Sequence, residues 1–199
     1  MATSSTRGRP RSFDRDVALD QAIRLFWRNG YEATSIRDLS EALGIGTPSL
    51  YNAFGDKQAL FTEAVGVYDR EYGEFIEAAL AEEPTAAAAI ARILSEAPAR
   101  YTRRGLPAGC LVVSGDAGCT DATIRRSLQR LRSHKTRLLT DKINADIATG
   151  QLPEDTDAAG WAGYVMVVLS GMAQRAQDGA TRSELTKIAQ IASDTGRMG

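Results

Sequence analysis

Hydrophobic side chains recur every three or four residues along most of this chain, a spacing that predicts amphipathic helices rather than strands. The first helix is expected to begin after Ser12 or Asp14, either of which can cap it, and to end at Asn29-Gly30. Because its apolar positions keep helical spacing, this helix should bury one face against the next elements.

Two short helices joined by a glycine turn are predicted next. The first begins where Ser35 and Asp38 have the spacing of a capping box, and it ends at the turn 44–46. Thr47 is a good cap for the second helix, and Pro48 suits its first position because a helix leaves that N–H unpaired. This second helix should run to about residue 54.

Longer helices are predicted in the rest of the chain. Residues 57–80 form one long amphipathic pattern, and an alanine-rich helix spans about 84–101, where Pro98 can kink it or end it early. The apolar run 110–114 is better explained as a buried helix than as a strand, because no other segment offers a partner strand. Further helices are expected over about 121–149, 155–178 and 182–194. The fold should therefore be all-α, with about nine helices.

The predicted helix 155–178 is apolar nearly all round. It carries one stripe of large residues and a neighbouring stripe of small ones, namely Trp161, Tyr164, Val165, Val168 and Met172, then Gly160, Gly163, Val167 and Gly171. Such a helix needs cover on both sides. Because a second copy of the chain covers both stripes more easily than one chain's remaining helices, we expect a homodimer.

The composition is that of a folded protein. The chain has 199 residues, of which 43% are apolar, and this is enough for a substantial core. No run approaches the ~18 uninterrupted apolar residues of a membrane helix, and residues 1–5 lack the apolar stretch of a secretory signal. We therefore expect a cytoplasmic protein with no membrane partner.

The residues that commonly carry catalysis or bind metals are few. Cys110 and Cys119 are the only cysteines and His134 is the only histidine. These are too few residues for the usual zinc sites or for histidine-based nucleophile systems. The fragment Gly44-Ile45-Gly46 lacks the preceding strand that a dinucleotide or phosphate-binding loop needs. We expect no cofactor, no metal and no enzymatic activity.

Positive charge is concentrated in an N-terminal arm, although the net charge of the chain is −1. Residues 1–11 contain Arg7, Arg9 and Arg11 without an acid, whereas residues 12–54 hold four arginines against six acids. An arm of this kind can lie along DNA phosphates or enter a minor groove. It can equally be a solvated tail.

The two short helices over residues 34–54 have the arrangement of a helix-turn-helix, in which the second helix enters the major groove and the first braces it on the backbone. The inner residues that would pack the two helices together are Ile36, Leu39, Leu43, Ile45, Leu50 and Phe54. Thr47, Ser49 and Asn52 are short hydrogen-bonding residues on the expected groove side, where they can reach bases or phosphates.

A resemblance to a known family rests on two runs of this region, YEATSIRDLSEALG at 31–44 and TPSLYNAFGDK at 47–57. They are similar to the head of a TetR/AcrR-family transcriptional regulator, and the similarity covers about residues 12–61. Many members carry a tyrosine or histidine pair before the phenylalanine. This chain has Tyr51-Asn52-Ala53 there, which leaves its base preference open.

The resemblance implies DNA-binding roles in this head. Thr34 would cap the second helix toward a phosphate, and Lys57 would hold a phosphate at the next helix N-terminus. Arg37 would bind phosphate or simply pair with Glu41, and Tyr51 would face DNA or belong partly to the core. The predicted DNA-binding residues are Arg9, Arg11, Thr34, Arg37, Thr47, Pro48, Ser49, Tyr51, Asn52 and Lys57.

The resemblance also implies two domains, a helix-turn-helix domain with its basic arm over 1–56 and a helical effector-binding and dimerisation domain over 57–199. Members of the family usually enclose an effector cavity in this body and dimerise through their last two long helices. The candidate cavity residues are Tyr101, Cys110, Val113, Trp161 and Tyr164, each of which is equally well explained as core.

The sequence thus predicts a DNA-binding transcriptional regulator, by resemblance a repressor, which a small-molecule effector releases from a palindromic operator of double-stranded DNA. One alternative is a helical adaptor that binds protein through its long helices, and another is a small-molecule-binding enzyme. The polar residues on the groove side and the arginine arm argue against the adaptor.

Overall fold

Ten helices build the part of the chain that the structure, a computed structural model, describes, which is residues 14–195. In chain order they are α1 (Arg15–Asn29), α2 (Ile36–Leu43), α3 (Thr47–Phe54), α4 (Lys57–Glu71), α5 (Phe75–Glu82), α6 (Ala86–Tyr101), α7 (Leu111–Ser114), α8 (Ala122–Ala148), α9 (Ala158–Gln177) and α10 (Arg182–Thr195). Residues 14–195 contain no strand, and the predicted all-α fold is confirmed. The run after Cys110 is a short helix, as expected.

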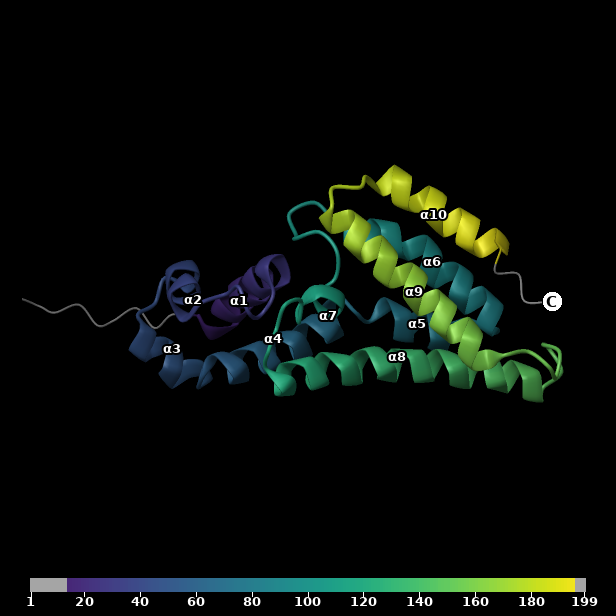
Figure 1. Cartoon of the computed structure of the whole chain (residues 1–199), viewed down its shortest axis with the longest axis horizontal. Helices are drawn as coiled ribbons and strands as arrows, with labels where there is room; N and C mark the ends of the chain where they lie inside the picture. Colours follow the sequence, from purple (N-terminus) through teal and green to yellow (C-terminus); the bar gives the residue numbers. More distant parts are fainter. Residues whose placement is uncertain (1–13, 196–199) are drawn as a thin grey trace, which may run out of the picture.

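The helices are divided between a small head and a larger body (Figure 1). Helices α1–α3 form the head at one end of the molecule, and α4 leads from it to the body. In the body α8 runs along one side, while α6, α9 and α10 lie together on the other. This arrangement places the helix-turn-helix at an exposed end of the molecule, with α3 outermost.

The caps of the head helices follow the sequence closely. Asp14 caps α1 by accepting hydrogen bonds from the backbone N–H groups of Asp16 and Val17. Ser35 and Asp38 form the predicted capping box at the start of α2. The expectation for Thr47 is wrong, because the cap of α3 is Gly46, and the Thr47 hydroxyl lies 3.3 Å from the Ser40 hydroxyl instead.

The predicted single helix over 57–80 is interrupted, which explains why ten helices are described rather than nine. Helix α4 ends at Glu71, and α5 begins at Phe75 after a short joint. At Gly73 an added Cβ would lie 2.6 Å from Asp69 Oδ1 and 2.8 Å from the Asp69 carbonyl oxygen, so only glycine fits this close approach. Apolar periodicity missed the break because Phe75 and Ile76 resume the buried pattern directly after it.

Two apolar cores hold the molecule together. One lies in the body and is built by α5, α6, α8, α9 and α10, with Pro98 buried inside an unbroken α6. The other fills the head but also includes Leu111 and Val112 of α7 and Ile124 and Leu128 of α8. The head is therefore packed against the body rather than suspended from it.

Within residues 14–195, no helix combines the length and the hydropathy required to cross a membrane.

Candidate DNA interface and ligand cavity

Helix α3 presents one polar face to solvent. Thr47, Pro48, Ser49 and Asn52 are exposed, and Tyr51 is 46% exposed, while Leu50 and Phe54 are buried on the opposite side. The structure therefore brings five of the predicted DNA-binding residues together on the outer surface of the head. Short hydroxyl and amide side chains on such a helix can reach base edges in a major groove.

The position of α3 is fixed by an arginine that the sequence reasoning did not select. Arg15 of α1 forms a bidentate ion pair with Glu63 of α4, at 2.7 and 2.8 Å, and its Nε donates to the carbonyl oxygen of Ala53. Its guanidinium also lies 4.6 Å from the ring centroid of Phe54. The Arg15 side chain thus joins α1 and α4 to the C-terminal end of α3.

Thr34 does not have the role that the resemblance implied. Its side chain is completely buried, and its hydroxyl donates a 2.7 Å hydrogen bond to the carbonyl oxygen of Gly30. Ser35, not Thr34, caps α2. The prediction that Thr34 caps this helix toward a phosphate is wrong, because the buried hydroxyl already closes the turn between α1 and α2.

Lys57 lies at the first position of α4, beside a helix N-terminus that favours anions. Its Nζ is 4.1 Å from the ring centroid of Tyr31, and Asp56 caps the helix by accepting from the N–H of Ala59. Burial, followed by the charges of nearby acids, raises the pKa of Tyr31, so this ring stays neutral beneath the ammonium group. The cation is held in place by the ring without being neutralised by it.

Arg37 forms the ion pair that the sequence offered as one alternative, with its Nε 2.9 Å from Glu41 Oε1. The hydrogen bond to Glu41 raises the pKa of Arg37, which remains charged. Both side chains are exposed, so this pair can open when a stronger anion approaches. Arg9 and Arg11 lie outside the described residues.

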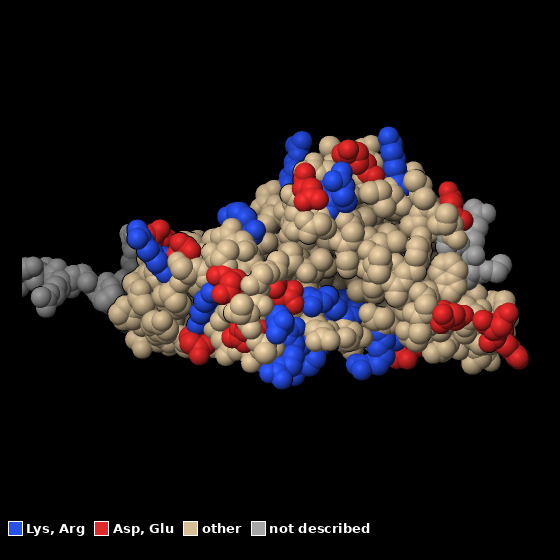
Figure 2. Space-filling view, in the orientation of Figure 1, with Lys and Arg blue, Asp and Glu red and all other residues tan. Residues whose placement is uncertain are grey.

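Exposed positive charge in the described chain is concentrated away from α3. Helix α3 has no charged residue, and its region of the surface is tan in Figure 2. Blue side chains gather along the first half of α8, where Arg125, Arg126, Arg130 and Arg137 are exposed. The polar face of α3 therefore offers only neutral hydrogen-bonding groups, and the cations that could contact phosphates lie on residues around it.

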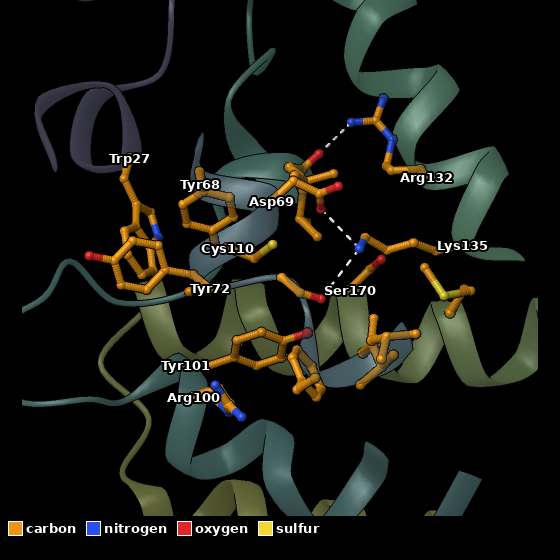
Figure 3. A pocket seen from close by; sticks show the side chains of 18 of the residues that line it. Trp27, Tyr68, Asp69, Tyr72, Arg100, Tyr101, Cys110, Arg132, Lys135 and Ser170 are labelled. Atoms are coloured by element: carbon orange, nitrogen blue, oxygen red, sulfur yellow. Dashed lines mark hydrogen bonds and ion pairs between the residues drawn. The ribbon is translucent and has the colours of Figure 1, made fainter. Parts of the chain in front are cut away.

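A cavity of about 50 Å³ lies between the head and the body. Its walls come from α1, α4, the α4–α5 joint, the start of α5, the end of α6 and the loop after it, α7, α8 and α9. Tyr101, Cys110 and Val113 line it, in agreement with the sequence, and Figure 3 shows Tyr101 and Cys110 at its edge.

Two of the five candidate cavity residues are elsewhere. Trp161 and Tyr164 do not line the cavity; their rings contact each other at 5.8 Å, and the Tyr164 hydroxyl lies 3.2 Å from the Thr195 hydroxyl. They belong to the surface between α9 and α10. The apolar stripe of α9 predicts its aromatic residues as cavity walls, but these two contact each other and α10 instead.

A buried lysine lines the cavity and forms ion pairs with two carboxylates. Lys135 Nζ lies 2.9 Å from Asp69 Oδ1 and donates to the carbonyl oxygen of Gly73 (Figure 3). It also lies 2.7 Å from Glu77 Oε1. Burial acts to lower the pKa of Lys135, but the hydrogen bonds and charges of Glu77 and Asp69 outweigh burial and raise it. The lysine is therefore charged and joins α8 to the end of α4 and to α5.

Cys110 is partly buried beside two tyrosines. Burial raises the pKa of its thiol, although a hydrogen bond with Tyr68 and the N–H groups of Val113 and Val112 act in the opposite direction. Burial also raises the pKa of Tyr68 and of Tyr101 well above the usual value. All three groups are neutral near neutral pH, and the thiolate that nucleophilic cysteine chemistry requires is disfavoured.

Several cavity residues were not found from the sequence, among them Trp27, Tyr68, Asp69, Tyr72 and Arg132. The one available signal was Lys135, a charged residue on the apolar face of the long helix, where a buried partner is required. The sequence pattern around Trp27 of α1 does not indicate a cavity, because an aromatic residue on the buried face of a helix has the same spacing in a packed core as in a cavity wall.

An apolar face remains uncovered on α9 and α10. Val167 is 71% exposed and Ile191 is 64% exposed, although both are large hydrophobic residues. An added Cβ at Gly163 or Gly171 of α9 would meet nothing within 4 Å. The small-residue stripe that needed a cover is thus left open by the described chain, as expected for a surface that a second copy covers.

Two family models match the chain. Residues 18–64 match the model described as bacterial regulatory proteins, tetR family, and residues 86–192 match the tetracyclin repressor-like C-terminal domain. The first match covers most of the head and the first half of α4, and the second covers α6 to α9 and most of α10.

Named relatives align over nearly the whole chain. The HTH-type transcriptional repressor ComR of Escherichia coli is 35% identical over 100% of this chain and 97% of its own length. The repressor BdcR of the same organism is 27% identical over 96% of this chain and 93% of its own.

A similar solved structure is a cysteine mutant of the TetR family regulator CifR complexed with 26-bp double-strand operator DNA. It is 38% identical, covers 94% of this chain and 98% of its own, and superposes with a TM-score of 0.87.

Proposed function

This chain belongs to the TetR family of bacterial regulatory proteins, and on that premise we propose that it represses transcription by binding a palindromic operator as a homodimer until a small-molecule effector releases it. It is a DNA-binding transcriptional regulator with an N-terminal helix-turn-helix head. Repression is supported by the relatives ComR and BdcR, which are named as repressors. The observation that carries the proposal is the exposed polar face of α3 on a capped helix-turn-helix.

We assign base recognition to Thr47, Ser49, Tyr51 and Asn52, because these exposed side chains share the outer face of α3. Asparagine can form a bidentate contact with adenine, and the hydroxyl groups can reach bases or phosphates. Pro48 lies on the same face, where its ring can contact apolar base edges.

Phosphate contacts fall to the residues around the reading helix. Lys57 at the N-terminus of α4 would hold a phosphate, Arg37 would supply a second contact by leaving Glu41, and the arm with Arg9 and Arg11 would add flexible ones. A regulator with these contacts acts where chromosomal DNA lies, in the cytoplasm.

The uncovered face of α9 and α10 supplies the dimer interface. Two copies joined there form a four-helix contact that buries Val167 and Ile191 and fills the stripe over Gly163 and Gly171. A two-fold dimer imposes a two-fold operator, with reading helices about 34–36 Å apart, or somewhat more on deformed DNA. In this scheme residues 1–56 read DNA and residues 57–199 dimerise and bind the effector.

An effector bound in the cavity would contact helices that position the DNA-binding head. Trp27 of α1 and Tyr68, Asp69 and Tyr72 of α4 line it, so a molecule that changes its shape displaces the two helices that carry the reading helix. A small change in the distance between the heads of a dimer prevents both α3 helices from fitting the two operator half-sites at once. Allosteric couplings of about 1–3 kcal/mol change affinity roughly 5- to 150-fold, which is enough for release.

A mobility shift and a footprint on the DNA upstream of its own gene, both at one fixed salt concentration, test the proposal. We expect a two-fold symmetric footprint, abolished in a Ser49→Ala and Asn52→Ala double variant. The matched control is Glu154→Ala, an exposed residue between α8 and α9 at the opposite end of the molecule, which should bind as the wild type does. A protein that shifts no DNA at low salt, as the adaptor alternative requires, would refute the proposal. Protection of a single unrepeated half-site would refute the dimeric mode.

A further inference from the structure

One side chain of the cavity has a buried polar donor without a partner, whereas Asp69 Oδ1, which also lacks a hydrogen bond, lies 2.9 Å from the ammonium group of Lys135. Trp27 is 3% exposed, and its indole N–H finds no hydrogen-bond acceptor within residues 14–195. Tyr101 is also buried and lines the same cavity, and burial raises the pKa of its hydroxyl, which therefore keeps its proton. Figure 3 shows the nitrogen of Trp27 and the oxygen of Tyr101 turned toward the space that they border. A buried donor left without an acceptor costs about 1–3 kcal/mol, so a ligand that accepts from it gains affinity.

The charged groups around the cavity leave little demand for an ionic ligand. Lys135 is paired with Asp69 and Glu77, Arg132 with Asp116, and Arg100 with Glu96. Arg103 also lines the cavity, but it is an exposed residue and is therefore solvated at the surface. An ion entering the cavity would lose its hydration, and the buried charge that it would meet there, Lys135, is already paired with Asp69 and Glu77.

The remaining walls favour an apolar body. They include the rings of Trp27, Tyr68, Tyr72 and Phe75 and the side chain of Leu169. A volume of about 50 Å³ corresponds to roughly four water-sized spheres at ~10–15 Å³ each. This space matches a molecule of few heavy atoms.

We propose that the effector of this regulator is a small, uncharged molecule with an apolar body and one hydrogen-bond acceptor, such as a ketone, aldehyde, ester or ether, whose oxygen accepts from Trp27 Nε1–H. The Tyr101 hydroxyl supplies the second polar contact at the opposite wall. This inference rests on the proposed release by an effector and adds its chemical class.

The contact at Trp27 places the ligand directly against the DNA-binding head. Trp27 lies on α1, and its ring packs against Tyr68 and Tyr72 of α4, with centroids 4.8 and 5.3 Å apart. Arg24 of the same helix donates a 2.8 Å hydrogen bond to the carbonyl oxygen of Gly105, in the loop that closes the cavity. A ligand held by the indole therefore acts on α1 itself as well as on α4.

The indole N–H resonances give a direct test. The chain has two tryptophans, so an ¹⁵N-labelled protein shows two indole signals, and Trp161→Phe assigns the one that belongs to Trp27. Four probes of similar shape are added in turn: butanone, 2-methyl-1-butene, in which a methylene replaces the carbonyl oxygen, propanoate and sec-butylammonium. We expect butanone to move the Trp27 proton signal downfield with saturation and to leave the Trp161 signal in place.

The four probes should rank by chemistry. Loss of one net hydrogen bond weakens binding roughly 2- to 10-fold, so 2-methyl-1-butene should bind that much more weakly than butanone, and the two ions should not saturate the signal. Equal binding of butanone and the alkene, tighter binding of either ion, or no saturable shift with butanone would each overturn the proposal.

Substitution of the donor gives the second measurement. Trp27→Phe keeps an aromatic ring but removes the N–H, and it should weaken butanone roughly 2- to 10-fold while leaving the alkene within about two-fold. Trp161→Phe is the matched control and should change neither affinity. If Trp27→Phe does not fold, the probe ranking on the wild-type protein still decides. A wild-type protein that binds its operator but fails the probe ranking would refute the ligand class alone, whereas one that does not bind DNA would refute the proposed function.

Discussion

Replacing Lys135 with methionine tests the ion cluster that joins α8 to α4 and α5. Methionine retains most of the apolar stem but removes the ammonium group, so Asp69 and Glu77 lose their shared cation. The lysine side chain is 6% exposed, while those of Asp69 and Glu77 are 20% and 36% exposed. The variant therefore leaves two carboxylates facing each other in a partly dry environment.

The magnitude follows from this burial. Removing one partner of a fully buried ion pair costs about 3–5 kcal/mol, because an uncompensated charge is left inside. Water reaches both carboxylates here, which screens part of that penalty, and we expect Lys135→Met to lower the free energy of unfolding by about 2–3 kcal/mol.

The pH dependence of this loss has a definite sign. The pKa of Lys135 is raised in the folded protein, so its contribution is complete below the unfolded value of 10.5 and disappears only as pH rises through the higher folded value. As far as the lysine determines it, the difference between wild type and variant should be constant between about pH 7 and pH 9.

Urea unfolding at one fixed protein concentration measures the effect, since dimerisation makes apparent stability depend on concentration. The control is Arg37→Met, which breaks an exposed pair and should change stability by less than about 0.5 kcal/mol. Adding Asp69→Leu and Glu77→Leu to Lys135→Met should recover most of the loss, because the unpaired charges are removed. A Lys135→Met variant as stable as the wild type would show that the cluster is not a structural element.

Three further variants separate the roles proposed for the surface. Asn52→Ala should alter discrimination among half-site bases by about 1–3 kcal/mol, measured by competition between operator variants, and an unchanged preference would remove Asn52 from the groove. Lys57→Ala should weaken all DNA alike and reduce the salt slope by about one, and a full slope would exclude a phosphate contact. Val167→Glu places a charge in the open apolar face and should yield monomers in sedimentation, whereas an intact dimer would place the interface elsewhere.

Local signals in the sequence were sufficient for most of the fold. The capping box of Ser35 and Asp38 predicted where α2 begins, because caps depend on side chains within a few residues of each other. The break at Gly73 was missed because the buried pattern resumes directly after it, and the close approach of Gly73 to Asp69 exists only once α4 has formed. Thr34 was misassigned for the same reason, since Ser35 beside it could serve as the cap and only the folded turn buries Thr34.

The site was predictable to the extent that it lies on one element. The exposed face of α3 follows from helical periodicity alone, so Ser49 and Asn52 were placed correctly on the surface. The cavity is assembled from elements far apart in the chain, and no local pattern brings Trp27 to Tyr101. Periodicity identifies the buried faces of helices, but it does not tell which of these faces pack against each other and which border a cavity.

The packing of the head against α7 and α8 has a consequence for those who build new genetic switches from parts of natural ones. Leu111, Val112, Ile124 and Leu128 complete the core of the head although they follow it by fifty residues or more in the chain. A hybrid that grafts a foreign head at residue 56 would place unfamiliar side chains against these four. An exchangeable cassette must therefore be discontinuous, carrying the head together with α7 and the first turns of α8, or those four positions must be redesigned for each new head.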